Sequence, residues 1–353
     1  MHILIIPTSY PNDYNPISNI FFRDQAEALS ANGLKVGVLA IIPIPLKEII
    51  KHKKLHFGLK NYENDGVVTY LFMFPALPKT DRLKQWLRKK IALWAFKKYK
   101  AKIGIPDILH VHTYKAAISA QAIKKTYNIQ YVITEHSTAF ARKLLSQEYG
   151  RPFSYVPNVV DTTFFLPSKK FNSKKSLRLL NIGYLEKKKQ QDLLLFAFKK
   201  VTEDFKDIQL IIGGSGPEEL SLKYLASELD LNSNVSFLGK LSREEVKEEL
   251  LKCDIFVLSS KIETFGVVLI ESLSCGKPVV ATRSGGPESI IIDKKYGVLT
   301  ENSIDGLSEG ILEVVLNIKK YNLNEIRSYV ENTFSKEAIS RQLIKIYRQV
   351  LSC

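Results

Sequence analysis

Short apolar runs alternate with segments of helical periodicity along the whole chain. The runs are rich in valine and isoleucine and are bounded by glycine, proline or polar residues. They lie at residues 3–6, 36–42, 67–74, 108–112, 131–134, 177–183, 208–214, 235–239, 255–260 and 278–282. Such runs are typical of parallel strands that are buried on both faces. With the helices between them they predict repeated β-α units, and therefore an α/β fold of doubly wound parallel sheets.

The strand and helix pattern occurs twice. Between its two occurrences lies the segment 157–176, whose tail is polar, rich in lysine and without periodicity. We therefore predict a first domain over residues 1–160, a linker over 161–176 and a second domain over 177–335. Two such domains that face each other would form a cleft at the carboxyl ends of their sheets, where open α/β folds bind ligands.

The last segment, 336–353, has the pattern of an amphipathic helix. It carries an apolar stripe formed by Ile339, Leu343, Ile346, Tyr347 and Val350. A helix with such a stripe must bury it against another element. We expect this helix to pack on the first domain.

Composition limits the classes of protein that need to be considered. The 353 residues are 45% hydrophobic and 25% charged, which excludes disordered, collagen-like and disulfide-scaffold proteins. The net charge of +15 indicates a nucleic acid, an anionic membrane face or a polyanionic small substrate as partner. Three cysteines without CxxC spacing predict neither a disulfide framework nor a zinc site. With no signal-peptide pattern and no long apolar run, we expect a cytoplasmic protein.

Several common cofactor motifs are missing from the sequence. Residues 213–219, GGSGPEE, do not complete the dinucleotide motif GxGxxG, and residues 275–278, CGKP, do not form a P-loop. Asp-x-Asp, a simple carboxylate pair for a magnesium-bound diphosphate, does not occur. We therefore predict neither a cofactor nor a metal site.

The densest chemical signal is residues 259–290. Here an apolar strand ends, Glu263 and Thr264 follow in a loop, and Phe265 and Gly266 open a helix that carries Glu271. The N-terminus of a helix suits a phosphate, and glycine lets the phosphate approach the backbone. One carboxylate placed for a sugar and one for a ribose, on either side of a phosphate site, predict a pocket for a nucleotide sugar.

At the level of motifs the sequence resembles the retaining glycosyltransferases of family 4, which have the GT-B fold. The resemblance rests on VPNVVDTTFF at 156–165, LIIGGSGPE at 210–218, VSFLG at 235–239, ETFGVVLIE at 263–271 and GKPVVATRSGGPESI at 276–290. It implies two facing Rossmann-like domains, the first binding the acceptor and the second the nucleotide-sugar donor, with the C-terminal helix crossing back to the first.

The resemblance also implies roles for residues of the second domain. Glu263 would contact the hydroxyls of the donor sugar, Glu271 the ribose, and Lys189 the phosphates. Tyr184 stands where the family usually has arginine, which leaves more of the diphosphate charge to Lys189. Backbone groups would complete the donor site at Gly183, at Phe237 and Leu238 for the base, and at Phe265, Gly266 and Val267 for the distal phosphate.

In the first domain the resemblance is weaker. It identifies His112, at the end of DILHVHT, as the histidine near the transferred sugar, and His136 in TEHST is a second candidate. Asn19 stands where a glycine of the family would be expected. We take Asn19 and His136 as candidates on the acceptor side.

Residues 79–102 concentrate the positive charge, with ten Lys or Arg and one Asp. Apolar residues recur on one side at helical spacing: Leu83, Trp86, Leu87, Ile91 and Trp94. A basic amphipathic helix with tryptophans indicates binding to an anionic membrane surface. A helix packed on the core with a basic outer face is the alternative.

Taken together, the sequence predicts a retaining, metal-independent hexosyltransferase with a nucleotide-diphosphate sugar as donor. We expect a UDP-sugar, with GDP-mannose as the alternative, and a glycan or lipid-linked saccharide as acceptor in cell-surface polysaccharide synthesis. The expected location is the cytoplasm, with peripheral attachment to the inner face of the plasma membrane as an option. A nucleotide-sugar epimerase or a phosphorylase on the same fold is one alternative. A basic nucleic-acid-binding protein is another, but no recognisable nucleic-acid motif accompanies the charge, so nucleic acid is not an expected partner.

Overall fold

The computed structural model describes residues 1–13, 15, 20–51, 55–76, 81–136, 154–167 and 176–352. The chain forms two compact units. Unit 1 comprises the described residues up to 159 and those from 336 onward, and unit 2 comprises those of 160–335. The last helix of the chain therefore belongs to the same unit as the N-terminus.

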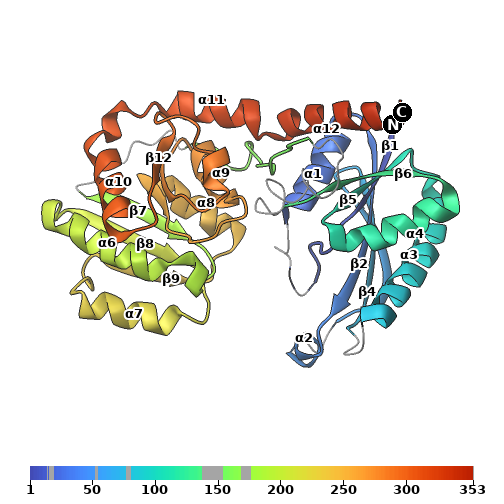
Figure 1. Cartoon of the computed structure of the whole chain (residues 1–353), viewed down its shortest axis with the longest axis horizontal. Helices are drawn as coiled ribbons and strands as arrows, with labels where there is room; N and C mark the ends of the chain where they lie inside the picture. The colour runs from blue at the N-terminus through green and yellow to red at the C-terminus, as the bar shows by residue number, and fades with distance from the viewer. Residues whose placement is uncertain are drawn as a thin grey trace. The chain divides into compact units, whose positions relative to one another are not determined.

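Unit 1 is built on a six-stranded sheet with the strand order β3-β4-β2-β1-β5-β6 (Figure 1). The strands are parallel except β3, which runs antiparallel to β4 at the edge. The elements are β1 (His2–Ile6), α1 (Ile20–Ala31), β2 (Lys35–Ile44), α2 (Leu46–Lys51), β3 (Gly58–Asn64), β4 (Val67–Pro75), α3 (Asp81–Ile103), β5 (Ile108–His112), the 3-10 turn η1 (Tyr114–Ala116), α4 (Ala117–Tyr127), β6 (Gln130–Thr134) and α12 (Lys336–Leu351).

The C-terminal helix α12 belongs to the core of unit 1. It lies beside α1 (Figure 1) and contacts β6. Its apolar stripe buries Ile339, Leu343 and Tyr347 in the same cluster as Phe22 of α1. The Tyr347 hydroxyl is 2.6 Å from Nδ1 of His110, which is fully buried in β5. This hydrogen bond gives the polar end of Tyr347 a partner inside the core, as a buried phenol requires.

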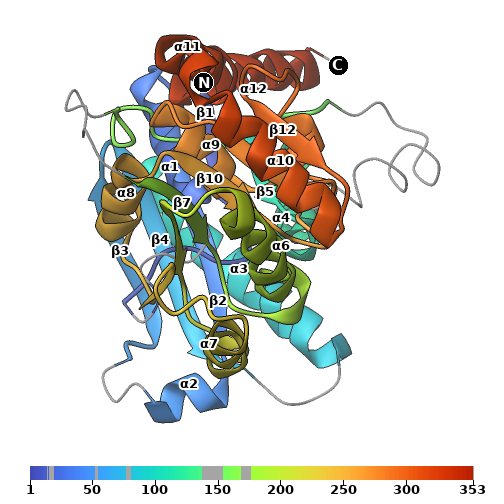
Figure 2. The same ribbon diagram turned by 90° about the vertical axis from the view of Figure 1, so that its left-hand side faces the viewer.

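Unit 2 contains a second six-stranded sheet, all parallel, in the order β12-β11-β10-β7-β8-β9. Helix α10 lies along α6 (Figure 2). The elements are β7 (Leu177–Ile182), η2 (Lys187–Lys189), α6 (Gln191–Asp204), β8 (Ile208–Gly213), α7 (Glu219–Glu228), β9 (Val235–Gly239), α8 (Arg243–Lys252), β10 (Ile255–Leu258), α9 (Val267–Ser274), β11 (Val279–Thr282), η3 (Pro287–Ser289), β12 (Gly297–Thr300), α10 (Ile304–Leu316), η4 (Ile318–Lys320) and α11 (Leu323–Thr333).

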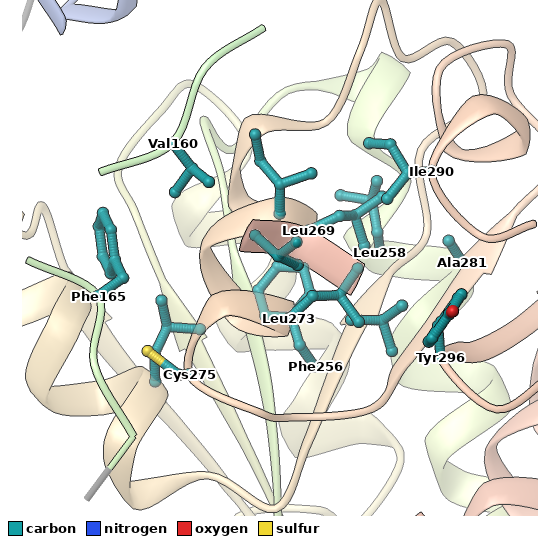
Figure 3. Close-up of a cluster of buried hydrophobic side chains, with 14 of the residues drawn as sticks. Val160, Phe165, Phe256, Leu258, Leu269, Leu273, Cys275, Ala281, Ile290 and Tyr296 are labelled. Atoms are coloured by element: carbon teal, nitrogen blue, oxygen red, sulfur yellow. The ribbon is translucent and has the colours of Figure 1, made fainter. Parts of the chain in front are cut away.

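The core of unit 2 holds helix α9 against the sheet. Leu269 and Leu273 of α9 lie over Phe256 and Leu258 of β10, and Phe165 joins the same cluster from the segment that precedes β7 (Figure 3). Leu269, Leu273 and Phe256 are fully buried. This apolar packing holds the start of α9 in place beside the end of β10, where the densest sequence signal lies.

The predicted α/β class with two parallel-sheet domains is confirmed. In each sheet the chain winds outward in both directions from a central pair of strands, β1 and β5 in unit 1 and β7 and β10 in unit 2. Crevices at the carboxyl ends of such pairs are the usual ligand sites of doubly wound sheets. Among the described residues, no helix has the length and apolar character needed to cross a membrane.

Candidate functional site

In unit 2, Lys189 and Glu263 meet at the carboxyl ends of the central strands. Lys189 ends the turn η2, which follows β7, and Glu263 lies in the loop that follows β10. The Lys189 ammonium donates to Oε2 of Glu263 over 2.5 Å, and the two side chains are 19% and 10% exposed. The lysine has three N–H donors, so this ion pair leaves two that can meet an anion. The structure thus brings these two predicted site residues together.

Hydrogen bonds hold Glu263 from several sides. Its Oε1 accepts the backbone N–H of Thr264 at 3.0 Å, and its Oε2 accepts the Ser260 hydroxyl at 3.4 Å. Its own backbone N–H donates to Ser284, and its carbonyl accepts the N–H of Gly286. The carboxylate is therefore positioned by its neighbours before any ligand arrives, as a binding group should be.

The loops around this pair pack backbone against backbone. A Cβ on Gly214 would lie 1.8 Å from the carbonyl oxygen of Gly183, and one on Gly286 would lie 2.4 Å from that of Phe265. No side chain fits at such distances. The glycines in GGSGPEE and RSGGPES thus serve close loop packing, and Gly183 forms the turn after β7 as predicted from the motif.

Helix α9 begins just after the loop that carries Glu263. Gly266 precedes it with φ of +93°, a conformation that favours glycine, and no side chain caps the helix. Uncapped N–H groups at the start of a helix attract anions. The ring of Phe265 is buried against Phe334, so only its backbone is available to a ligand, and Val267 is half-buried. Glu271 lies half-buried in α9, about one turn after the helix begins.

Phe237 and Leu238 lie at the far edge of the same sheet, on β9. Strands β7 and β8 separate β9 from β10, so about 14 Å lies between the outer two at the usual strand spacing. Leu238 is 39% exposed, and Gly239 carries φ of +70° and accepts the N–H of Gly214. A ligand that contacts both Glu263 and this edge must be extended.

In unit 1, two of the predicted residues form a hydrogen-bonded pair. His112 ends β5, and His136 follows β6, the neighbouring strand. Nδ1 of His112 lies 2.9 Å from Nε2 of His136, and Nδ1 of His136 lies 2.8 Å from Oδ1 of Asn158. Nε2 of His112 is buried and has no hydrogen-bond partner among the described residues. An unpaired buried acceptor or donor costs about 1–3 kcal/mol, so a group in this state requires an explanation.

Burial keeps these histidines neutral. It lowers the pKa of His110 to about 3, with a smaller effect from the charge of His136. It also lowers the pKa of His136 to about 4, although the hydrogen bond to Asn158 opposes the change. The pKa of His112 is well below the usual value, first through burial and then through its two histidine neighbours. None of the three is therefore a cation at neutral pH.

Sequence reasoning missed three residues of these sites. Thr113 follows His112 with φ of +70°, a strained conformation for a β-branched residue, and such strain often marks a functional site. Gln190 follows Lys189 with φ of +47°, and Oε1 of Gln190 is buried without a partner among the described residues. Asn158 was visible only as part of a linker motif. Asn19, predicted as an acceptor-side residue, lies outside the described residues.

Residues 164–332 match the family model of glycosyl transferases group 1. One of the subunits of the human phosphatidylinositol N-acetylglucosaminyltransferase is 27% identical over 69% of this chain. A Corynebacterium glutamicum protein, a GDP-mannose-dependent monoacylated α-(1-6)-phosphatidylinositol monomannoside mannosyltransferase, is 29% identical over 65% of it.

Among solved structures, the Anabaena protein HepE in complex with UDP and glucose superimposes with a TM-score of 0.71 at 16% identity, covering 98% of this chain and 99% of that one. At this identity the likeness concerns the fold alone. The chain spans only 57% of the human relative and 65% of the corynebacterial one. The chain has the GT-B fold, and its residues 164–332 resemble the glycosyl transferases group 1.

Proposed function

We propose that the protein is a retaining, metal-independent glycosyltransferase that moves a hexosyl unit from a nucleotide-diphosphate sugar to a glycan or lipid-linked saccharide. The observation that carries the proposal is the Lys189–Glu263 pair, which lies where β7 and β10 end, close to the uncapped start of α9. A cation, a helix N-terminus and a fixed carboxylate are the groups that a diphosphate and a sugar require. The biological role that we propose is cell-surface polysaccharide synthesis.

The chemistry follows from the charge that develops during transfer. When the bond from the sugar to the diphosphate breaks, negative charge accumulates on the leaving phosphate and positive charge on the sugar. Lys189 and the N–H groups of α9 would stabilise the phosphate, and Glu263 would hold the sugar hydroxyls. The acceptor hydroxyl attacks from the face that the diphosphate leaves, and its proton passes to the departing phosphate oxygen. No residue of the protein has to act as a nucleophile.

The donor that we propose is a UDP-sugar, with GDP-mannose as the alternative. A nucleotide-diphosphate sugar is an extended ligand, and its length suits the separation of β9 from β10. The base would lie against the backbone of Phe237 and Leu238, and the ribose against Glu271. The names of two similar proteins support this class of donor, since one names GDP-mannose and the other UDP with glucose.

Replacing Glu271 by alanine tests the donor site. We expect Glu271→Ala to weaken UDP-glucose binding about 10- to 100-fold, because two charged hydrogen bonds to the ribose would be lost. Isothermal titration calorimetry measures the affinity, with GDP-mannose titrated in parallel. Glu309→Ala, an exposed carboxylate of α10, is the matched control and should bind as the wild type does. Unchanged binding in Glu271→Ala would refute the assignment, and turnover of the donor to an isomeric nucleotide sugar without acceptor would favour the epimerase.

We further propose that the protein works at an anionic membrane surface. Helix α3 buries Ala92, Phe96 and Tyr99 in the core of unit 1, whereas Trp86 is 55% and Trp94 45% exposed. A groove of about 290 Å³ runs between α3 and α4 and is lined by Trp86, Lys89, Lys90, Leu93, Gln121, Ala122, Lys125 and Thr126. Exposed tryptophans among lysines are typical of interfacial helices. The phosphatidylinositol in the names of two relatives supports a lipid-borne acceptor.

Charge reversal on α3 tests the membrane surface. Each basic residue near an anionic bilayer contributes about 1 kcal/mol, so Lys89→Glu with Lys90→Glu should weaken binding to phosphatidylglycerol vesicles at least about 30-fold. Vesicle sedimentation measures this partitioning, and vesicles of pure phosphatidylcholine provide the uncharged reference. Lys319→Glu with Lys320→Glu, an exposed pair in unit 2, is the control of equal charge. If both double variants lost vesicle binding to the same extent, the effect would come from total charge and α3 would not be the membrane-binding surface.

A further inference from the structure

Three side chains of unit 1 form a hydrogen-bonded chain that ends at an unpaired atom. Asn158 contacts His136 at 2.8 Å, and His136 contacts His112 at 2.9 Å. His112 and Asn158 are buried, and His136 between them is half-buried. Nε2 of His112, on the far side of that ring, is buried and has no partner among the described residues. The hydrogen-bonded chain thus begins at an amide and ends at a nitrogen that has no partner in the described part of the protein.

The direction of the hydrogen bonds follows from the chemistry of the first group. The Oδ1 atom of Asn158 can only accept, so Nδ1 of His136 carries its proton. Nε2 of the neutral His136 ring then has a lone pair and accepts, which requires Nδ1 of His112 to be the donor. The same rule leaves Nε2 of His112 without a proton. This nitrogen is therefore an acceptor, and the missing partner must be a donor.

The surroundings of His112 indicate that the missing donor belongs to a ligand. The rings of Phe22 and His110 both pack against the His112 ring, each with a centroid 4.4 Å away, and this packing restricts its rotation. The strained Thr113 follows directly, and its hydroxyl lies 3.4 Å from that of Thr8, which follows β1. These features coincide with the carboxyl ends of β1 and β5, where a doubly wound sheet binds its ligand.

We propose that Asn158 and His136 are positioning residues, which hold His112 in the tautomer whose Nε2 accepts a hydrogen bond from a hydroxyl of the sugar substrate. This inference rests on the proposed function, because it takes the ligand of unit 1 to be a saccharide. It assigns His136 a role through His112 in place of direct contact with the acceptor. It also explains why this buried polar network ends on an atom that no described side chain or backbone group satisfies.

The tautomer can be observed directly in the intact protein. Long-range ¹H–¹⁵N spectra of ¹⁵N-histidine-labelled protein at pH 8 should show His112 protonated at Nδ1. Asn158→Leu removes the acceptor and should redistribute the His112 signal toward the other tautomer, whereas Asn158→Asp, whose carboxylate only accepts, should restore the wild-type pattern. Thr134→Val removes the hydrogen bond to His110 and should leave the His112 tautomer unchanged, which separates positioning from a general loss of stability.

A binding experiment then connects the tautomer to the sugar. UDP and UDP-glucose are titrated calorimetrically into each variant, or GDP and GDP-mannose if the wild type prefers guanosine. Asn158→Leu should lower affinity for the nucleotide sugar about tenfold while that for the nucleotide is unchanged, and Asn158→Asp should recover it. The proposal is wrong if His112 of the wild type is protonated at Nε2. It is also wrong if Asn158→Leu leaves the tautomer of His112 unchanged. Failure of every nucleotide to bind would instead refute the proposed function, and the spectra would still decide the tautomer.

Discussion

Replacing Lys189 by alanine is expected to lower kcat for sugar transfer by about 100- to 1000-fold. This is the usual effect of removing one group that stabilises charge developing in a transition state. In the proposed site Lys189 carries most of the diphosphate charge, because Tyr184, which is 58% exposed, stands where the resemblance implies an arginine. The measurement is the rate of nucleotide diphosphate release with saturating donor and acceptor.

The control for this experiment is the neighbouring lysine. Lys188 lies in the same turn, is 55% exposed and pairs with Glu186 at 2.9 Å. Lys188→Ala should change kcat less than about threefold, because an exposed ion pair is worth little. Lys189→Arg keeps the charge beside Glu263 and should retain part of the activity, which shows that the alanine variant fails through lost charge and not through misfolding. Comparable losses in Lys188→Ala and Lys189→Ala would contradict a specific role for Lys189.

Unit 1 is expected to lose about 4 kcal/mol of its free energy of unfolding between pH 7 and pH 5. Burial lowers the folded-state pKa of His110 to about 3 and that of His136 to about 4, while both are about 6.5 in the unfolded chain. Between these values the unfolded chain binds more protons, so acid favours unfolding. Each histidine then costs about 2 kcal/mol at pH 5. The stabilising contribution of the neutral rings is complete above pH 6.5 and is lost as the pH falls.

Other groups of unit 1 modify this loss in predictable directions. The buried His112 and the partly buried His2 have lowered pKa values and act in the same sense. Glu27 acts in the opposite sense, because burial raises the pKa of its carboxyl group.

The measurement uses the tryptophans as a reporter of one unit. Trp86 and Trp94 are the only tryptophans of the chain, and both lie on α3 in unit 1. Urea unfolding followed by tryptophan fluorescence at pH 7 and pH 5 therefore reports on this unit. His136→Gln should reduce the pH-dependent loss by about 2 kcal/mol, whereas His56→Gln, at an exposed position, should leave it unchanged. Equal unfolding midpoints at both pH values would contradict the expectation.

The local pattern of apolar residues was sufficient to predict the strands that are covered on both faces. The ten apolar runs all lie on strands of the structure, because parallel strands covered on both faces must be continuously apolar. Strand β3 was not predicted, since its sequence, GLKNYEN, is polar and lies at the sheet edge. Strand β12, GVLT at the other sheet's edge, was also missed, because its apolar residues form a run of only two.

The candidate site residues also fall into two groups, those that the sequence indicates and those that only the structure shows. Glu263, Gly266 and Glu271 could be predicted because one short segment contains them all, and Lys189 because the family resemblance assigns it to the phosphates. Asn158 and Thr113 could not be found. Asn158 stands out through its hydrogen bond to His136, 22 positions away, and Thr113 through its positive φ angle. Neither property can be recognised from the type of residue.

By itself, the sequence determined the fold class and the family resemblance, and it supplied the candidate residues of 259–290, because strand burial and contiguous motifs are local properties of the chain. Only the tertiary structure decided that Tyr347 of the last helix contacts His110, that the tryptophans of α3 remain exposed, and that His112 ends a buried hydrogen-bonded chain. These facts depend on which side chains, distant in the sequence, come into contact and on which polar atoms find a hydrogen-bond partner. Such relations arise when the chain folds, and no periodicity or spacing along it encodes them.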